Sequence, residues 1–374
     1  MSVPSETPSP RIVSLDQFRG YTIAGMFLVN MIGSYACMAP NFGHHGNYFS
    51  YADTIMPQFF FAVGYAFRLT FGRTVEKLGT GAAYRKAIKR NLGLILFGAI
   101  YYGFGNRHEN WAALQAAGVM GFFTRDFWGS VYQALVHIGM TGLWLVPVIA
   151  ASTRVLALFM VFTGALHLLL MHSFYAAWAA HMPITDGGPL GFMSWAIPTL
   201  AGAMACDWMR GRGPRRALVP ILGWGMALCL AGYGLSCLTA VRLVIDGQST
   251  AQGFGRWLVE PPFVPPSLPP DIWTMSQTTA SVTYMTFSAG FCLAVFALFV
   301  IACDLLPLRI GVLRTLGTNA LAAYLIHNIV DNALTPYVPN DAPLWYTLAG
   351  FSVYFGICYL FLRFLEKNKL FLKL

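Results

Sequence analysis

Ten long apolar runs are the feature that most restricts how this chain can fold. They cover residues 17–38, 51–71, 90–105, 130–150, 154–172, 191–209, 217–240, 280–303, 312–332 and 343–363. A helix needs about 20 mostly apolar residues to cross the hydrocarbon core of a bilayer. The composition agrees, because only 10% of the residues are charged, whereas soluble domains carry about 25%. We therefore expect an all-α integral membrane protein, a polytopic bundle of about ten transmembrane helices in a cell (inner) membrane.

The basic residues predict the orientation of this bundle. If the N-terminus is cytoplasmic, all but four of the 24 Lys and Arg residues fall on the cytoplasmic side, the exceptions being Arg107, Arg125, Arg242 and Arg256. Basic residues concentrate in cytoplasmic loops of membrane proteins. Both termini are therefore expected in the cytoplasm. The same distribution accounts for the net charge of +9 without nucleic acid, for which the chain has no recognisable motif.

The chain divides into a short tail and one membrane domain. Residues 1–13 are polar and rich in Pro and Ser, which predicts a disordered cytoplasmic tail, and residues 14–374 form the single transmembrane domain. Within the exterior segment 241–279, the stretch "EPPFVPPSLPPDIWTMS" cannot continue a helix. It is either a linker or a lid over an exterior cavity. The seven cysteines show no CxxC or His-spaced pattern, so we expect neither a disulfide framework nor a metal site.

Polar side chains interrupt the first apolar run, "SLDQFRGYTIAGMFLVN". Ser14 and Gln17 have the spacing of a capping box, and Asp16 and Arg19 can pair across one helical turn. Asn30 lies roughly 20 Å further along the helix, in the outer half of the bilayer. Such an Asn is either a hydrogen-bonding contact between helices or part of a site.

Histidines and a carboxylate follow in "GHHGNYFSYADTIMP". His44 and His45 lie between the first two apolar runs, and Asp53 falls in the first turn of the second. A carboxylate beside a histidine fixes its tautomer and stabilises the imidazolium, which makes an acid–base pair. The alternative is two exposed loop histidines with no role in chemistry.

A polar stripe is predicted late in the chain. The stretch "LGTNALAAYLIHNIVDN" places Asn319, Tyr324, His327, Asn328 and Asp331 on one helix at nearly helical spacing. A helix that is polar on one side within a membrane faces a cavity or another polar helix. Three other histidines are expected to be hydrogen-bonded core residues: His137, His167 and His172.

Four stretches resemble the heparan-α-glucosaminide N-acetyltransferase family and its bacterial relatives, a branch of the transmembrane acyltransferases. The first is the Asp, Phe-Arg-Gly and Val-Asn pattern of "SLDQFRGYTIAGMFLVN". The others are "ADTIMPQFFFAVGYAF", "DIWTMSQTTASVTYMTFSAGF" and "LGTNALAAYLIHNIV". All four occur in the family's order across residues 14–330. The matching residues in the last three are Asp53 and Pro57, then Trp273, Thr274 and Ser276, then Gly317, Asn319, Ala320 and Tyr324.

The resemblance implies transfer of an acetyl group from cytoplasmic acetyl-CoA to an acceptor amine across the membrane. The family's reactive Asn corresponds to Asn30. Its reactive His stands about ten residues before the Asp, within a Trp-Asn-Gly context that "HHGNYF" lacks. Here His44 is nine residues and His45 eight residues before Asp53. A second departure is His137, where the family has Arg.

We accordingly expect an acyltransferase that uses acetyl-CoA or another acyl-CoA, without a metal. His44 or His45 would be the general base or a transient acyl carrier, oriented by Asp53, and Asn30 would donate to the carbonyl oxygen. The resemblance also suggests further binding residues: Asp16, Arg19, Asn319 and Tyr324 for acetyl-CoA, and Trp273 and His327 for the acceptor.

The expected partners are acetyl-CoA, a glycan or amino-sugar acceptor at the exterior face, and the lipid bilayer. A transporter or flippase without covalent chemistry is the main alternative, and an inactive scaffold is a third. The acceptor, the acyl chain length and the oligomeric state stay open, with a homodimer among the options.

Overall fold

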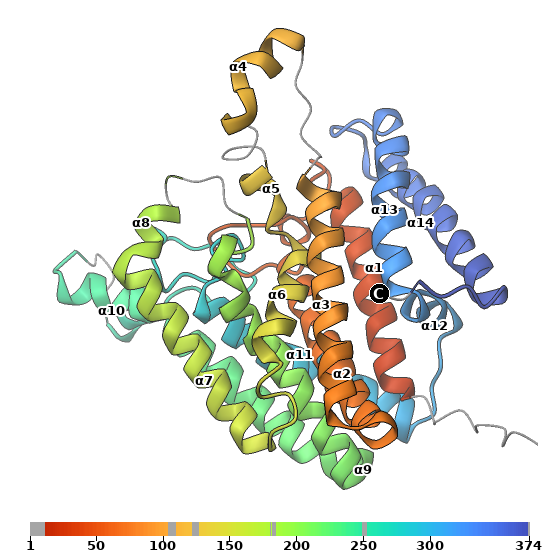
Figure 1. Ribbon diagram of the computed structural model, residues 1–374. Coiled ribbons are helices and arrows are strands. Elements are labelled where there is room, and N and C mark those ends of the chain that lie inside the picture. The colour runs from red at the N-terminus through yellow and green to blue at the C-terminus, as the bar shows by residue number, and fades with distance from the viewer. Residues whose placement is uncertain are drawn as a thin grey trace, which may run out of the picture.

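The computed structural model describes residues 12–103, 110–121, 127–179, 181, 185–248 and 253–372. Throughout these residues the chain is helical or irregular and contains no strand, which confirms the all-α fold class for the described ranges. Most of the predicted N-terminal tail, residues 1–11, lies outside them. Figure 1 shows the arrangement of the helices.

Helices form most of the chain. In the first half they are α1 (Val13–Ile32), α2 (Ala52–Leu78), α3 (Thr80–Gly103), α4 (Trp111–Gly121), α5 (Trp128–Val131), α6 (Ala134–Leu145), α7 (Thr153–Leu170) and α8 (Ala176–Ala179). In the second half they are α9 (Gly191–Ser236), α10 (Leu238–Ile245), α11 (Val282–Phe299), α12 (Gly311–Thr318), α13 (Ala320–Leu334) and α14 (Leu344–Lys367). The π-helical turns Met171–Tyr175 and Val300–Leu305 extend α7 and α11.

Four helical stretches are long and apolar enough to cross a membrane, as judged by length and composition. They are Thr153–Ala179, Gly188–Ile245, Val282–Leu305 and Leu344–Lys367. Every predicted apolar run overlaps at least one helix. The described part of the chain therefore has the character of a helical membrane protein. The number of ten spans remains a prediction.

Several predicted boundaries are wrong. The first helix ends at Ile32 instead of residue 38, and the chain then turns through a 3-10 helix at Pro40–Phe42. The run 312–332 is two helices, because Asn319 leaves helical geometry (φ −124°, ψ 53°). The runs 191–209 and 217–240 belong to one helical stretch, bent at Gly213 (φ 71°, ψ 167°). Hydropathy detects apolar length and is insensitive to one residue with non-helical backbone angles.

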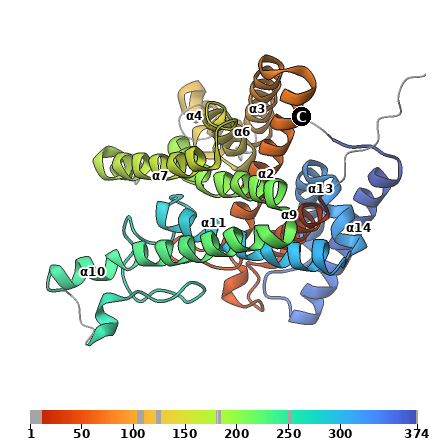
Figure 2. The ribbon, with the colours of Figure 1, turned by 90° about the horizontal axis from the view of Figure 1, so that it is seen from below.

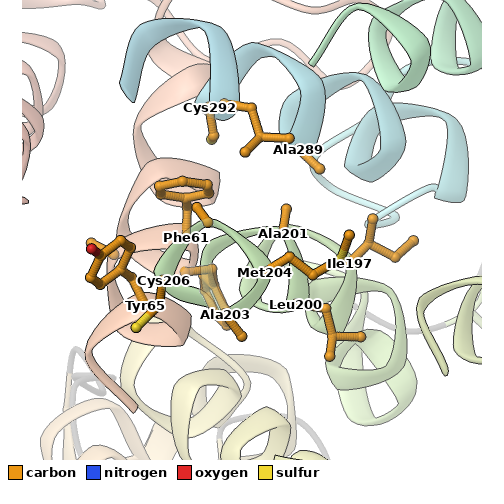
Figure 3. Packing of buried hydrophobic residues seen from close by; sticks show 14 of the residues in the cluster. Phe61, Tyr65, Ile197, Leu200, Ala201, Ala203, Met204, Cys206, Ala289 and Cys292 are labelled. Atoms are coloured by element: carbon orange, nitrogen blue, oxygen red, sulfur yellow. The ribbon is translucent and has the colours of Figure 1, made fainter. Parts of the chain in front are cut away.

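The main core lies where α9 packs between α2 and α11 (Figures 1 and 2). Figure 3 shows Phe61 of α2 beside α9 and α11, whose buried residues there include the small side chains Ala201, Ala203 and Ala289. At the α2–α9 crossing the backbones touch, because a Cβ on Gly64 would lie 1.8 Å from the carbonyl oxygen of Thr199. Tight crossings between small residues are typical of helices that pack within membranes.

A second core surrounds α1. In Figure 1, α1 lies beside α13, and α12 packs against its first half. Phe27 of α1 meets Tyr354 of α14 edge to face, with ring centroids 5.6 Å apart. The outward face of α14 is apolar and exposed at Trp345, Leu360 and Phe364. This exposed apolar face is what a helix in contact with lipid would show.

The Pro-rich segment lies against the loop between α1 and α2. The amide of Phe263 donates to the carbonyl of Phe49 at 2.7 Å, and the side chain of Asn41 donates to the carbonyl of Phe263 at 3.0 Å. The rings of Phe263 and Phe49 also pack edge to face at 5.3 Å. In its described part this segment is thus a packed cover of the α1–α2 loop and not a free linker; residues 249–252 lie outside the description.

Candidate functional site

A histidine–carboxylate pair forms where the α1–α2 loop enters α2. His44 Nδ1 lies 3.0 Å from Asp53 Oδ1, with the Asp53 side chain 1% exposed and the His44 side chain 49% exposed. The amide and the hydroxyl of Ser50 donate to Asp53 Oδ2 at 3.0 and 2.8 Å. Asp53 is therefore held rigidly and orients His44, which leaves imidazole Nε2 as the nitrogen available to a ligand.

The two adjacent histidines have different surroundings. His45 Nε2 lies 2.8 Å from the carbonyl oxygen of Pro40, so that nitrogen donates and cannot act as a base. Its ring stacks on Tyr48 with centroids 4.4 Å apart. The sequence did not decide whether His44 or His45 is the reactive histidine. In the structure it is His44 that pairs with the Asp53 carboxylate.

A cavity of about 200 Å³ opens beside this pair. It is lined by His44, His45, Gly46, Asp53, Thr185, Asp186, Gln277 and Thr278. Gln277 Nε2 donates to Asp186 Oδ1 at 3.1 Å, and the hydroxyl of Tyr284 donates to the carbonyl of Asp53 at 2.6 Å. Neither Asp186 nor Gln277 was among the site residues predicted from the sequence. The available signals were an acid before two glycines in "TDGG" and a Gln beside the quoted Trp-Thr-Met-Ser stretch.

Two groups in this cavity have shifted pKa values. Burial by itself lowers the pKa of His44, but the hydrogen bond and charge of Asp53 and the charge of Asp186 outweigh it, so the pKa lies above the usual 6.5. Burial raises the pKa of Asp186 to about 6, an effect that Gln277 and His44 reduce. Both shifts move the groups toward neutral pH, where proton transfer by side chains is most effective.

Asn30 lines a different and larger cavity, of about 600 Å³. Its described lining residues are uncharged if His327 is neutral: Asn30, Tyr101, Tyr102, Ser130, Gln133, Tyr324, His327, Asn328, Ile329 and Asn332. His327 Nδ1 lies 2.6 Å from the carbonyl of Tyr324, so it carries the proton. In the neutral ring, Nε2 then accepts from the Asn30 amide at 3.1 Å. Asn30 and His44 thus line separate cavities and not the single centre that we expected.

The two cavities approach each other near Asp186. The Tyr102 and Tyr324 hydroxyls, which line the larger cavity, share a hydrogen bond, and the charge of Asp186 acts on Tyr324. Thr185, which lines the smaller cavity, donates to the carbonyl of Tyr132, next to Gln133 of the larger one, at 3.5 Å. Asp186 thus lines the smaller cavity and lies near enough to Tyr324 of the larger cavity for its charge to act there.

Two predicted binding residues have other roles. The Asn319 side chain donates to the carbonyl of Leu370 at 2.9 Å and accepts from the amide of Leu372 at 3.3 Å, so it fastens the C-terminal segment. It is also separated from the polar stripe by the break between α12 and α13. Trp273 lies outside the lining of both cavities, and its amide donates to Asp271 in a local turn.

The start of α1 packs tightly against α12. A Cβ on Gly20 would lie 1.8 Å from the carbonyl oxygen of Leu313, and one on Gly317 would lie 2.1 Å from that of Asp16. Gln17 exchanges hydrogen bonds with the backbone of Ile310, at 3.0 and 3.2 Å, and does not form the predicted capping box. The glycines of the Phe-Arg-Gly and Gly-Thr-Asn motifs therefore have a packing role.

Charged groups gather at the same end of the bundle. Asp16 interacts electrostatically with Arg19, as predicted from their spacing, and the positive charges of Arg19 and Arg90 act on each other. Arg90 and Lys86 line a cavity of about 100 Å³ between α2 and α3. Neighbouring cations of this kind create a site for an anion.

The other predicted core histidines depart from expectation. His137 and His167 are buried, yet neither ring nitrogen of either side chain has a hydrogen-bond partner among the described residues. His172 is exposed. No group of three or more His, Cys, Asp or Glu side chains in the described ranges could hold a metal ion.

Comparison with protein-family models gave no match for this chain, and a search of curated proteins gave none. The resemblance to the N-acetyltransferase family is therefore carried by the quoted motifs alone.

Proposed function

We propose that this protein is a multi-pass inner-membrane acyltransferase that moves an acetyl or acyl group from cytoplasmic acyl-CoA to an exterior amine or hydroxyl, with a sugar as acceptor. The observation that carries the proposal is the His44–Asp53 pair, because a buried carboxylate orients a histidine at the wall of a 200 Å³ cavity. The proposed topology has ten spans with both termini in the cytoplasm. Asp53 orients the base, and the family motifs supply the reaction class.

The proposed reaction balances as a direct transfer. His44 Nε2 takes the proton of the acceptor N–H or O–H while that nitrogen or oxygen bonds to the thioester carbonyl carbon. The tetrahedral intermediate then collapses, the C–S bond breaks, and the imidazolium returns its proton to the departing sulfur. The products are an amide or ester and free CoA.

Asn30 has a place in this scheme. It uses one amide N–H for His327 and retains a second N–H at the larger cavity. We place the thioester carbonyl there, where this N–H stabilises the negative oxygen of the intermediate. The acceptor then bridges the two cavities where they approach each other at Asp186 and Tyr324.

The cations near Arg19 support the donor side of the proposal. Phosphate groups of CoA require positive partners, and Arg19, Arg90 and Lys86 lie at the end of the bundle that the charge distribution assigns to the cytoplasm. Arg90 has no ion-pair partner within the described residues.

A transporter remains the second candidate because of one observation. The larger cavity has a volume of about 600 Å³ and is rich in hydrogen-bonding groups, and its lining within the described ranges is uncharged when His327 is neutral. A transported sugar needs such a site and needs no base. Consumption of acyl-CoA separates the two functions.

The test uses purified protein in lipid nanodiscs with radiolabelled acetyl-CoA, glucosamine as amine acceptor and glucose as hydroxyl acceptor. We expect CoA release that depends on acceptor. His44→Ala should lower kcat/KM by about 10²- to 10⁴-fold, and His45→Ala, the adjacent control, should change it only a few-fold. Equal losses in both variants, or no turnover in the wild type, would count against the proposal.

A further inference from the structure

The turn that carries Asp186 is held in an unusual backbone conformation. Asp186, Gly187 and Gly188 have φ angles of 53°, 85° and 57°. Such angles are common for Gly and uncommon for other residues, although Asp tolerates them better than most. The turn is fastened from two sides, since Trp195 Nε1 donates to the carbonyl of Asp186 at 2.9 Å and the Tyr175 hydroxyl donates to that of Gly187 at 2.6 Å.

These contacts aim one carboxylate at the cavity that His44 also lines. Gln277 holds Asp186 Oδ1 at 3.1 Å, and the amide of Gly187 donates to the carbonyl of Thr278 at 2.9 Å. Gln277 and Thr278 line the same cavity. Asp186 Oδ2 accepts no hydrogen bond from any described residue. One oxygen is thus fixed by the protein and the other is left for a ligand.

The second carboxylate of the cavity is already occupied. Asp53 Oδ1 is bonded to His44, and Asp53 Oδ2 accepts from both the amide and the hydroxyl of Ser50. Asp186 is therefore the carboxylate that can form a new bond. A carboxylate that faces a small cavity prefers a positively charged donor, because charge-assisted hydrogen bonds are about twice as strong as neutral ones.

The lining of the larger cavity indicates what the rest of the ligand must be. Among the residues that the structure describes, its lining contains amides, hydroxyls and a histidine whose Nδ1 proton is fixed by the Tyr324 carbonyl, but no carboxylate. A ligand that spans both cavities would meet uncharged hydrogen-bonding groups on one side and the Asp186 carboxylate on the other. The matching chemistry is a neutral polar body with one protonated amine.

We propose that Asp186 is a positioning residue that selects acceptors carrying a protonated primary amine and anchors that amine beside His44. The ammonium group donates to Asp186 Oδ2 on binding, and Gln277 keeps the carboxylate in place. Before transfer the ammonium loses one proton to water, and the neutral amine that results gives its next proton to His44 as it attacks. Transfer to this acceptor rests on the proposed function, whereas recognition of its charge does not.

The experiment compares two probes that differ at one position, glucosamine with an amine and glucose with a hydroxyl. Binding to the wild-type protein in nanodiscs is measured by calorimetry without acyl-CoA. We expect glucosamine to bind roughly 10- to 100-fold more tightly than glucose, the range that one charge-assisted hydrogen bond supports. Equal binding of the two sugars by the wild type would overturn the proposal without any variant.

Three variants test whether the Asp186 side chain causes the preference for glucosamine. Asp186→Asn should remove the preference for glucosamine, Asp186→Glu should restore part of it, and Asp341→Asn should leave it intact, since Asp341 is an exposed acid in the turn before α14. If Asp186 has only a structural role, Asp186→Asn should lower the melting temperature and weaken the binding of both sugars equally. A preference that survives in Asp186→Asn would refute the assignment.

Turnover distinguishes this inference from the proposed function. If the protein is an acyltransferase, Asp186→Asn should raise the KM for glucosamine more than it lowers kcat and should leave the KM for acetyl-CoA unchanged. If the wild type consumes no acetyl-CoA but still prefers glucosamine, the proposed function fails and the charge selection by Asp186 stands.

Discussion

Replacing Asp53 by Asn should weaken the His44–Asp53 pair by removing one of the hydrogen bonds that Asp53 accepts. Both Asp53 oxygens are acceptors, Oδ1 for His44 and Oδ2 for the amide and hydroxyl of Ser50. An Asn side chain has the same shape but presents one NH₂ group. In either orientation this NH₂ faces the His44 nitrogen or the Ser50 amide, so one buried hydrogen bond is lost.

The size of the effect follows from the exposure of His44. A hydrogen bond to a charged group contributes about 1.5–3 kcal/mol. Because the His44 side chain is 49% exposed, solvent screens the interaction and the lower part of that range applies, about 1.5–2 kcal/mol. At about 1.4 kcal/mol per factor of ten, kcat/KM for acyl transfer should fall about 10- to 30-fold.

The pH profile supplies a second, independent expectation. The base must be neutral, so activity rises with pH through the pKa of His44, which Asp53 and Asp186 hold above its usual value. With Asp53 neutralised, its charge no longer favours the imidazolium, so that pKa falls. The acidic limb of the profile for Asp53→Asn should therefore shift to lower pH, even though the maximal rate is reduced.

The assay measures acetyl-CoA consumption from acidic to alkaline pH, with Asp341→Asn as the control for a lost carboxylate. An unchanged or upward-shifted limb in Asp53→Asn would refute the assignment of His44 as the base. A loss of activity accompanied by a large drop in melting temperature would instead mark Asp53 as a structural residue.

Two further predictions concern stability and are measured by unfolding in detergent. Gly20→Ala should cost about 1–3 kcal/mol or more by overpacking against the Leu313 carbonyl. The control is Gly223→Ala, at a helical glycine with open space around it, which should be neutral or stabilise by about 0.5–1 kcal/mol. Equal changes in stability in the two variants would contradict the close crossing of α1 and α12 at Gly20. Asn30→Leu should cost about 1–3 kcal/mol because His327, 1% exposed, loses the donor to its Nε2; an unchanged melting temperature would show that this bond does not form.

The sequence was sufficient for features that depend on neighbouring residues. Each apolar run overlaps a helix, because the apolar surface and the helical period are both properties of a continuous stretch. The His44–Asp53 pair was also foreseeable, since its members are nine residues apart and flank the start of one helix. The choice between His44 and His45 required the turn at Pro40–Phe42, which orients the two rings differently.

Contacts between distant segments were decided only by tertiary structure. Asn30 was expected at one reaction centre with His44 because the family resemblance assigns the reactive Asn and His to these positions, yet it bonds to His327 of α13, 297 residues away. Asp186 joins the cavity through Gln277, 91 residues further along the chain. Hydropathy reports how much apolar surface each helix must bury but not against which partner. That choice depends on backbone crossings such as Gly20 with Leu313, where the absence of a side chain lets two particular helices touch.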